Sequence, residues 1–167
     1  MTDNFPRAGF RRRFGSWVYD SLIFISIYMF IGLVYSAIFN TLFSLGYIEP
    51  NGFENGSDFA ANSMAFKLIL NISAFILISY FFVFFWARSG QTLGMRAWRL
   101  RVQTQNGDLI SKKTGLKRLL PTLLGLGNLA VIFDRKNKLS LQDKLTNTEV
   151  VFISLEANKG ANWSNGE

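Results

Sequence analysis

The feature that most constrains this chain is a run of 24 residues without a formal charge, from Leu22 to Leu45. At about 1.5 Å per residue, a helix of that length covers roughly 36 Å, more than the roughly 30 Å hydrocarbon core of a bilayer. A signal peptide has a shorter apolar region followed by a small-residue cleavage site, and this run has neither. The run therefore predicts a transmembrane helix that starts before the apolar residues, at about 8, and ends at about 45.

A second apolar run, Met64 to Ala87, predicts a second transmembrane helix over about 64–88. Its single charge, Lys67, lies near the start, where a long side chain reaches the headgroups. Two such runs cannot both be buried in a soluble domain of 167 residues. Between them, residues 46–63 contain Asn-Gly pairs and a proline, and we expect them to form a loop.

The distribution of basic residues predicts the orientation. Four arginines precede the first run, residues 46–63 contain no basic residue, and residues 88–167 hold 13 of the 18. Because excess Lys and Arg stay on the cytoplasmic side, we expect a cytoplasmic N-terminus and an outside loop at 46–63. The net charge of +7 then flanks the membrane, so the expected partner is a bilayer with anionic headgroups rather than nucleic acid. The expected headgroup contacts are Arg7, Arg11, Arg12, Arg88 and Arg96.

A cytoplasmic segment is expected over residues 89–156. Thr92 is a candidate N-cap for a short basic helix, an alternating pattern predicts a strand over 99–105, and residues 148–154 (TEVVFIS) are a second strand candidate. The apolar stretch 119–133, interrupted by a proline and two glycines, has about 15 residues and is too short for an ordinary span. We expect an interfacial or re-entrant helix there.

A short third span is the alternative for that stretch, and it would place the end of the chain outside. The expected fold class is membrane α-helical: two long transmembrane helices, a short apolar third helix and a small cytoplasmic β-strand element. Residues 157–167 are polar, and we expect a disordered tail.

The residue types exclude most catalytic chemistry. The chain has no cysteine and no histidine, which removes thiol nucleophiles, imidazole bases and the usual ligands of zinc and haem. The remaining candidate carboxylates near the membrane, Asp20, Asp134 and Asp143, have no spacing typical of a metal or nucleophile motif. We therefore expect a protein that is not an enzyme, with no catalytic residue, no metal site and no cofactor.

Two charged residues lie at the start of the first helix. A spacing of seven places Arg13 and Asp20 on one helical face, but about 10.5 Å of rise keeps them from pairing. Each side chain therefore needs another partner. One interpretation is that Arg13 binds lipid phosphate while Asp20 caps or orients the helix; the other is a functional site at the membrane edge.

The segment RAGFRRRFGSWVYD, before the first apolar run, resembles the start of the RDD family of bacterial membrane proteins. The later segments GQTLGMRAWRLRVQTQNGDLIS and DRKNKLSLQDKLTNTEVVFI resemble its second and closing blocks, in the same order. The family is named for one arginine and two aspartates, which the resemblance assigns to Arg13 (or its neighbour Arg12), Asp20 and Asp143. Many members have a Leu-His pair before the last aspartate, where this chain has Leu139 to Gln142 (LSLQ), so no histidine role carries over.

The resemblance implies a single membrane domain over residues 1–156, in a bacterial cytoplasmic (inner) membrane. It also suggests that Asp143 pairs with Arg13. The expected function is a non-enzymatic scaffold or regulatory protein with an Arg/Asp cluster at the cytoplasmic interface, partnered by a second copy or another membrane protein. The alternative is an oligomeric ion- or solute-coupled transporter that uses Asp20.

Overall fold

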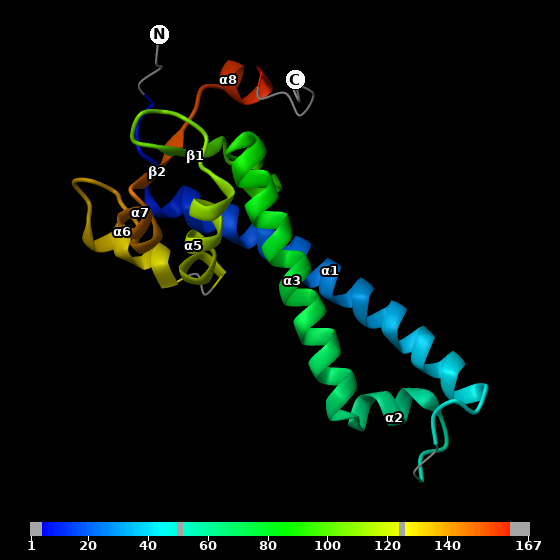
Figure 1. The fold of residues 1–167 in the computed structure, drawn as a ribbon. Helices are drawn as coiled ribbons and strands as arrows, with labels where there is room; N and C mark the ends of the chain where they lie inside the picture. The colour runs from blue at the N-terminus through cyan, green and yellow to red at the C-terminus, as the bar shows by residue number, and fades with distance from the viewer. Residues whose placement is uncertain (1–4, 50–51, 124–125, 161–167) are drawn as a thin grey trace. The chain divides into compact units, whose positions relative to one another are not determined.

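The computed structural model describes residues 5–49, 52–123 and 126–160, which are mainly helical with one small sheet (Figure 1). In chain order the elements are α1 (Phe10–Ser44), α2 (Gly56–Asn62), α3 (Met64–Ser89), α4 (Leu93–Ala97), β1 (Leu100–Thr104), α5 (Lys112–Leu123), the 3₁₀ helix η1 (Leu126–Leu129), α6 (Ala130–Phe133), α7 (Leu141–Thr146), β2 (Thr148–Phe152) and α8 (Leu155–Gly160).

The chain divides into two compact units. The middle unit is Ile23–Ile78, and the terminal unit combines Met1–Leu22 with Ser79–Glu167. Helices α1 and α3 each continue from one unit into the other. The expectation of a single domain over residues 1–156 therefore stays a prediction.

Two helices, α1 and α3, are long and apolar enough to cross a membrane, as the two apolar runs predict. Helix α1 begins at Phe10 rather than at residue 8, because the two residues before Gly9 are extended. Arg7 forms a bridge with Val151, and the Ala8 backbone N–H donates to the carbonyl of Val150 at 2.9 Å. Arg7 and Ala8 thus pair with the outer edge of β2.

The middle unit contains a helix that the loop pattern did not predict. The side chain of Asn55 accepts a hydrogen bond from the Asp58 backbone N–H at 2.9 Å and caps α2. An Asn-Gly pair indicates a turn, but the same asparagine oxygen also serves as a helix N-cap. Gly56 lies against α1, where a Cβ on Gly56 would be 2.8 Å from the Asn40 Cα. The expectation of loop structure throughout 46–63 is therefore wrong for α2.

The terminal unit is built around a two-stranded antiparallel sheet. β1 and β2 pair with Leu100 opposite Phe152 and Thr104 opposite Thr148, which confirms both strand patterns. Figure 1 shows α5, α6 and α7 gathered beside the sheet. The buried apolar side chains among the described residues of this unit are Ala8, Phe82, Trp86, Met95, Leu100, Val102, Ile110, Leu119, Val131, Val150, Val151 and Ile153.

The apolar stretch 119–133 does not form one straight helix. Its first part ends α5, and the axes of Lys112–Leu123 and Gly127–Phe133 are inclined by 87°. Such a bend occurs in a re-entrant loop or a broken span, and the depth of this segment stays a prediction. The expected disordered tail also differs in part: residues 157–160 belong to α8, and residues 161–167 lie outside the described residues.

Candidate functional site

The carboxylate of Asp143 binds two arginines, one through each oxygen. Its Oδ2 lies 2.6 Å from Arg13 Nη1, and its Oδ1 lies 2.8 Å from Arg118 Nη2. The exposed fraction is 0% for the Asp143 side chain and 3% for each arginine. The structure thus confirms the predicted pairing of Arg13 with Asp143 and adds a second guanidinium. We call these three residues the Arg/Asp cluster.

Local structure at the start of α7 fixes the position of Asp143. Ser140 is the N-cap, and its hydroxyl accepts from the Asp143 backbone N–H at 3.3 Å. In return, the Ser140 backbone N–H donates to Asp143 Oδ2 at 3.1 Å, which completes a capping box. The carboxylate therefore accepts from the start of its own helix as well as from the arginines.

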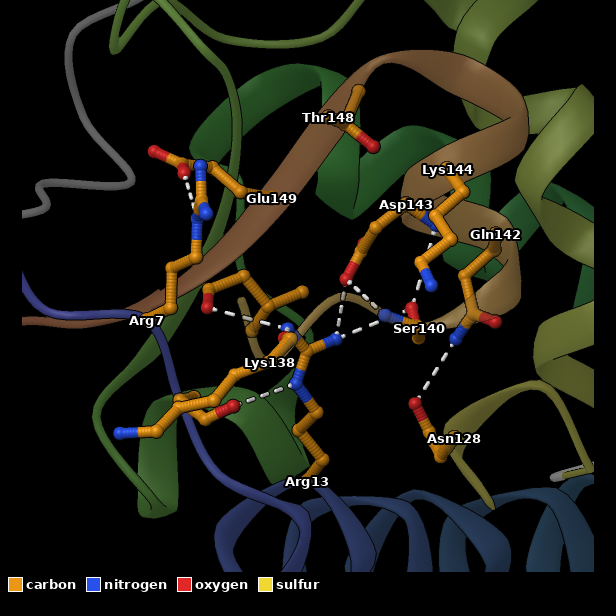
Figure 2. Close-up of polar contacts among 12 residues, drawn as sticks. Arg7, Arg13, Asn128, Lys138, Ser140, Gln142, Asp143, Lys144, Thr148 and Glu149 are labelled. Atoms are coloured by element: carbon orange, nitrogen blue, oxygen red, sulfur yellow. Dashed lines mark hydrogen bonds and ion pairs between the residues drawn. The ribbon is translucent and has the colours of Figure 1, made fainter. Parts of the chain in front are cut away.

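Arg13 also joins two further segments of the chain through hydrogen bonds. Nε donates to the Ala8 carbonyl at 3.0 Å, and Nη2 donates to the Lys138 carbonyl at 2.9 Å (Figure 2). Nη1 reaches the Ser140 hydroxyl at 3.2 Å as well as Asp143. One side chain on the first turn of α1 thus holds the extended N-terminal segment and the turn before α7.

Arg118 approaches the same carboxylate from α5. Its Nη1 donates to the hydroxyls of Thr148, at the start of β2, and of Thr146, at the end of α7. Because arginine presents a fork of donors, it satisfies a carboxylate and neighbouring hydroxyls at the same time. The cluster therefore ties α1, α5, α7 and β2 together.

The charge state of the cluster follows from its neighbours. Burial acts to raise the pKa of Asp143, but the charges of Arg13 and Arg118, with the hydrogen bonds from Ser140 and Arg118, hold that pKa below its ordinary value. The carboxylate is therefore ionised at neutral pH. The cluster carries one more positive than negative charge.

Asp20 binds a different part of the terminal unit, the start of α4. Its Oδ2 accepts from the Thr92 hydroxyl at 2.6 Å, and its Oδ1 accepts from the Gly94 backbone N–H at 2.9 Å. Thr92 is also the N-cap of α4, as its sequence position predicts, since its hydroxyl accepts from the Met95 N–H at 3.1 Å. As the spacing indicates, Asp20 and Arg13 have separate partners. Asp20 attaches α4 to α1.

A cavity of about 50 Å³ is lined by Arg13 and Arg118 of the Arg/Asp cluster and by Asp20. Three buried polar atoms of lining residues have no hydrogen-bond partner among the described residues: Trp86 Nε1, Arg118 Nε and Gln142 Oε1. A cavity of this size and polarity has room for water.

The five arginines expected at lipid headgroups have different surroundings. Arg7 forms an ion pair with Glu149 at 2.7 Å, and Arg12 lies over the Phe152 ring, 3.8 Å from its centroid. Arg11 is exposed, Arg88 is exposed with its guanidinium 5.7 Å from the Phe84 ring centroid, and Arg96 is half-buried. Their contact with headgroups stays a prediction.

Several partners in this site were not identified from the sequence. Arg118 was missed because its only signal is a basic residue before an apolar segment. Ser140 had a usable signal, because Ser-x-x-Asp is a capping-box spacing. Thr92 was identified as a cap but not as a partner of Asp20. Within the described ranges, no group of three or more acidic residues is placed to hold a metal ion.

Comparison with known proteins gives one match. The sequence model of the RDD family matches residues 7–147, which include all the residues of the Arg/Asp cluster and Asp20. No curated protein matches, and no solved structure matches.

Proposed function

The chain belongs to the RDD family, and from this premise we propose that it is a non-enzymatic membrane scaffold or regulatory protein. In this proposal α1 and α3 cross the bacterial inner membrane, and the terminal unit forms a fixed surface on the cytoplasmic side. That surface, together with the lipid-facing helices, binds a second copy or another membrane protein.

The observation that carries the proposal is the double pairing of Asp143 with Arg13 and Arg118. A carboxylate whose two oxygens both face buried guanidinium groups is held ionised and has little freedom to carry a proton or coordinate a substrate. Removing one partner from a buried pair of this kind costs about 3–5 kcal/mol, because the other charge stays buried. These properties favour a role in holding the terminal unit in one arrangement.

The distribution of basic residues supports the cytoplasmic placement of the terminal unit. The 46–63 segment lacks Lys and Arg, whereas residues 88–167 contain 13 of the 18. The positive-inside rule therefore favours a cytoplasmic terminal unit. The many exposed apolar side chains on α1 and α3 suit contact with lipid or with a partner's transmembrane helix.

The alternative function is ion- or solute-coupled transport by an oligomer, with Asp20 at the pathway. The cavity beside Asp20 supports this alternative. Against it, both oxygens of Asp20 accept hydrogen bonds from α4 and its N-cap, so a cation would have to replace two protein donors. Two transmembrane helices also cannot enclose a polar pathway by themselves, so transport requires several copies.

The test compares flux and association in the same preparations. Proteoliposomes containing the wild type, Asp20→Asn and the control Lys67→Met are assayed for proton, sodium and potassium flux. The scaffold proposal expects all three to match empty liposomes. Flux that is lost in Asp20→Asn but kept in Lys67→Met would establish the transporter.

Association is measured by purification in mild detergent followed by mass determination. The proposal expects a defined complex, with a second copy or another membrane protein, that dissociates in Asp143→Ala. A wild type that is strictly monomeric and without a partner, in detergent and in native nanodiscs, contradicts the scaffold proposal.

A further inference from the structure

A groove on the surface of the terminal unit combines an apolar lining with four cations. Its volume is about 540 Å³, within the range of small-ligand sites. The lining consists of Gly9, Phe10, Arg11, Arg12, Val131, Ile132, Arg135 and Lys138. No acidic residue is among them. From this combination we infer that the groove binds the anionic headgroup of a phospholipid.

The four cations of the groove have no acidic partner within ion-pair distance in the part of the chain that the structure describes. The nearest acid in sequence, Asp134, forms an ion pair with Lys144 at 2.8 Å. Arg12 lies over the Phe152 ring, a contact that leaves its charge uncompensated. The groove is therefore a concentrated positive surface that suits a phosphate group.

Apolar side chains beside the groove indicate a lipid rather than a free anion. The Phe133 side chain follows the groove residue Ile132 and is 88% exposed, and Leu129 on the same short segment is also exposed. Large exposed apolar side chains next to clustered cations are typical of surfaces that enter the headgroup region of an anionic bilayer. A free phosphate would use the cations and leave the apolar side chains in water.

The Arg/Asp cluster holds one wall of the groove in position. Arg13 Nη2 donates to the Lys138 carbonyl at 2.9 Å, and the Lys138 backbone N–H donates to the Asp134 carbonyl at 2.7 Å. Lys138 has a φ of 53°, a left-handed backbone that these bonds stabilise. Figure 2 shows the Lys138 side chain directed away from Asp143. The buried cluster thereby fixes the backbone of Lys138, whose charged side chain is exposed at the surface.

The inference deepens the proposed function and rests on its membrane placement of the terminal unit. Its test uses the full chain in mild non-ionic detergent, titrated with dioctanoyl phosphatidylglycerol or dioctanoyl phosphatidylcholine and read by native mass spectrometry. The test variant is Arg135→Gln/Lys138→Gln. The matched control is Lys112→Gln/Lys113→Gln, which removes the same charge from exposed positions at the start of α5.

The wild type should bind one phosphatidylglycerol in preference to phosphatidylcholine. The test variant should lose about 30-fold in affinity, from two cations that each contribute to headgroup attraction, and the control should keep the wild-type affinity. Thermal unfolding checks that both variants fold; if the test variant does not, Arg11→Gln replaces it, with an expected loss of several-fold.

Four results would overturn the inference. Equal binding of the two lipids, or equal loss in the test and control variants, means that there is no specific headgroup site. Displacement of phosphatidylglycerol by inorganic phosphate at similar concentration assigns the groove to a free anion, and displacement by polyglutamate assigns it to an acidic peptide. The flux and association measurements do not use these variants. Failure of the lipid-binding inference can therefore be distinguished from failure of the proposed function.

Discussion

Arg13 and Asp143, separated by 130 residues in the chain, form a buried ion pair with 2.6 Å between Nη1 and Oδ2. A direct bond of this kind fixes the first turn of α1 to the first turn of α7. Because Arg118 shares the carboxylate, the three side chains act as one group, and their contributions should not be additive.

Truncating either end of the pair should destabilise the protein. Arg13→Ala should lower the free energy of unfolding by about 3–5 kcal/mol, and Asp143→Ala by more, because it leaves two buried guanidinium groups unpaired. The double variant should lose less than the sum. Thermal unfolding in mild detergent measures all three.

The partly exposed ion pair of Arg7 with Glu149 is the control for this comparison of single and double variants. Its coupling should be at most about 1 kcal/mol, because water screens an exposed pair. Strictly additive losses for Arg13 and Asp143 would contradict a shared cluster.

Replacing Arg118 with lysine keeps the charge but removes the planar fork. An ammonium group cannot bond Asp143, Thr146 and Thr148 in the geometry of two guanidinium nitrogens. Arg118→Lys should therefore cost about 1–3 kcal/mol in unfolding free energy, measured as above. The neighbouring exposed Lys117→Arg should change it by less than about 0.5 kcal/mol. Equal losses of stability in Arg118→Lys and Lys117→Arg would show that the planar fork of Arg118 does not stabilise the cluster.

The approach of α4 to α1 depends on the absence of a side chain at Gly94. A Cβ there would lie 2.7 Å from the Asp20 Cγ and would also meet the Ser16 carbonyl. Gly94→Ala should lower the unfolding free energy by about 1–3 kcal/mol. Gly9→Ala is the matched control, since nothing lies within 4 Å of a Cβ at Gly9. A Gly94→Ala variant as stable as the control would show that Asp20 does not hold α4 closely.

The dependence of stability on pH follows from Asp143. Its pKa is held below its ordinary value of 3.8, so the folded state binds fewer protons than the unfolded state in acid. The stabilisation is therefore complete above about pH 4 and is lost as the pH falls through the lower, folded-state pKa. The difference in melting temperature between wild type and Asp143→Asn should be constant from neutral pH to about pH 5 and shrink below pH 4. A difference that shrinks near neutral pH would mean that the carboxylate is not held ionised.

Sequence patterns predicted the long-range architecture better than the local partners. Long apolar runs predict α1 and α3, and alternation predicts β1, because each pattern reflects one physical requirement along a continuous segment. Asn55 shows the limit of such patterns, since the same side chain favours a turn or caps a helix.

The candidate site was predictable only in part. Family resemblance assigned Arg13, Asp20 and Asp143, and their charges in an apolar setting required partners. Arg118 and the groove around Lys138 depend on how α5 and the 134–138 turn fold back on α1, and no periodicity in one segment encodes that tertiary contact.

The wide separation of Arg13 and Asp143 in sequence also has a consequence for biogenesis. At about 5–20 residues per second, the ribosome extends the chain by 130 residues, from Arg13 to Asp143, in a time on the order of ten seconds. Within that interval α1 and then α3 become available for insertion, while Arg13 still lacks its carboxylate and β2 has not been made. The terminal unit therefore closes only after β2 has been made, and chains truncated before Asp143 should leave a membrane intermediate in which Arg13 has no carboxylate partner.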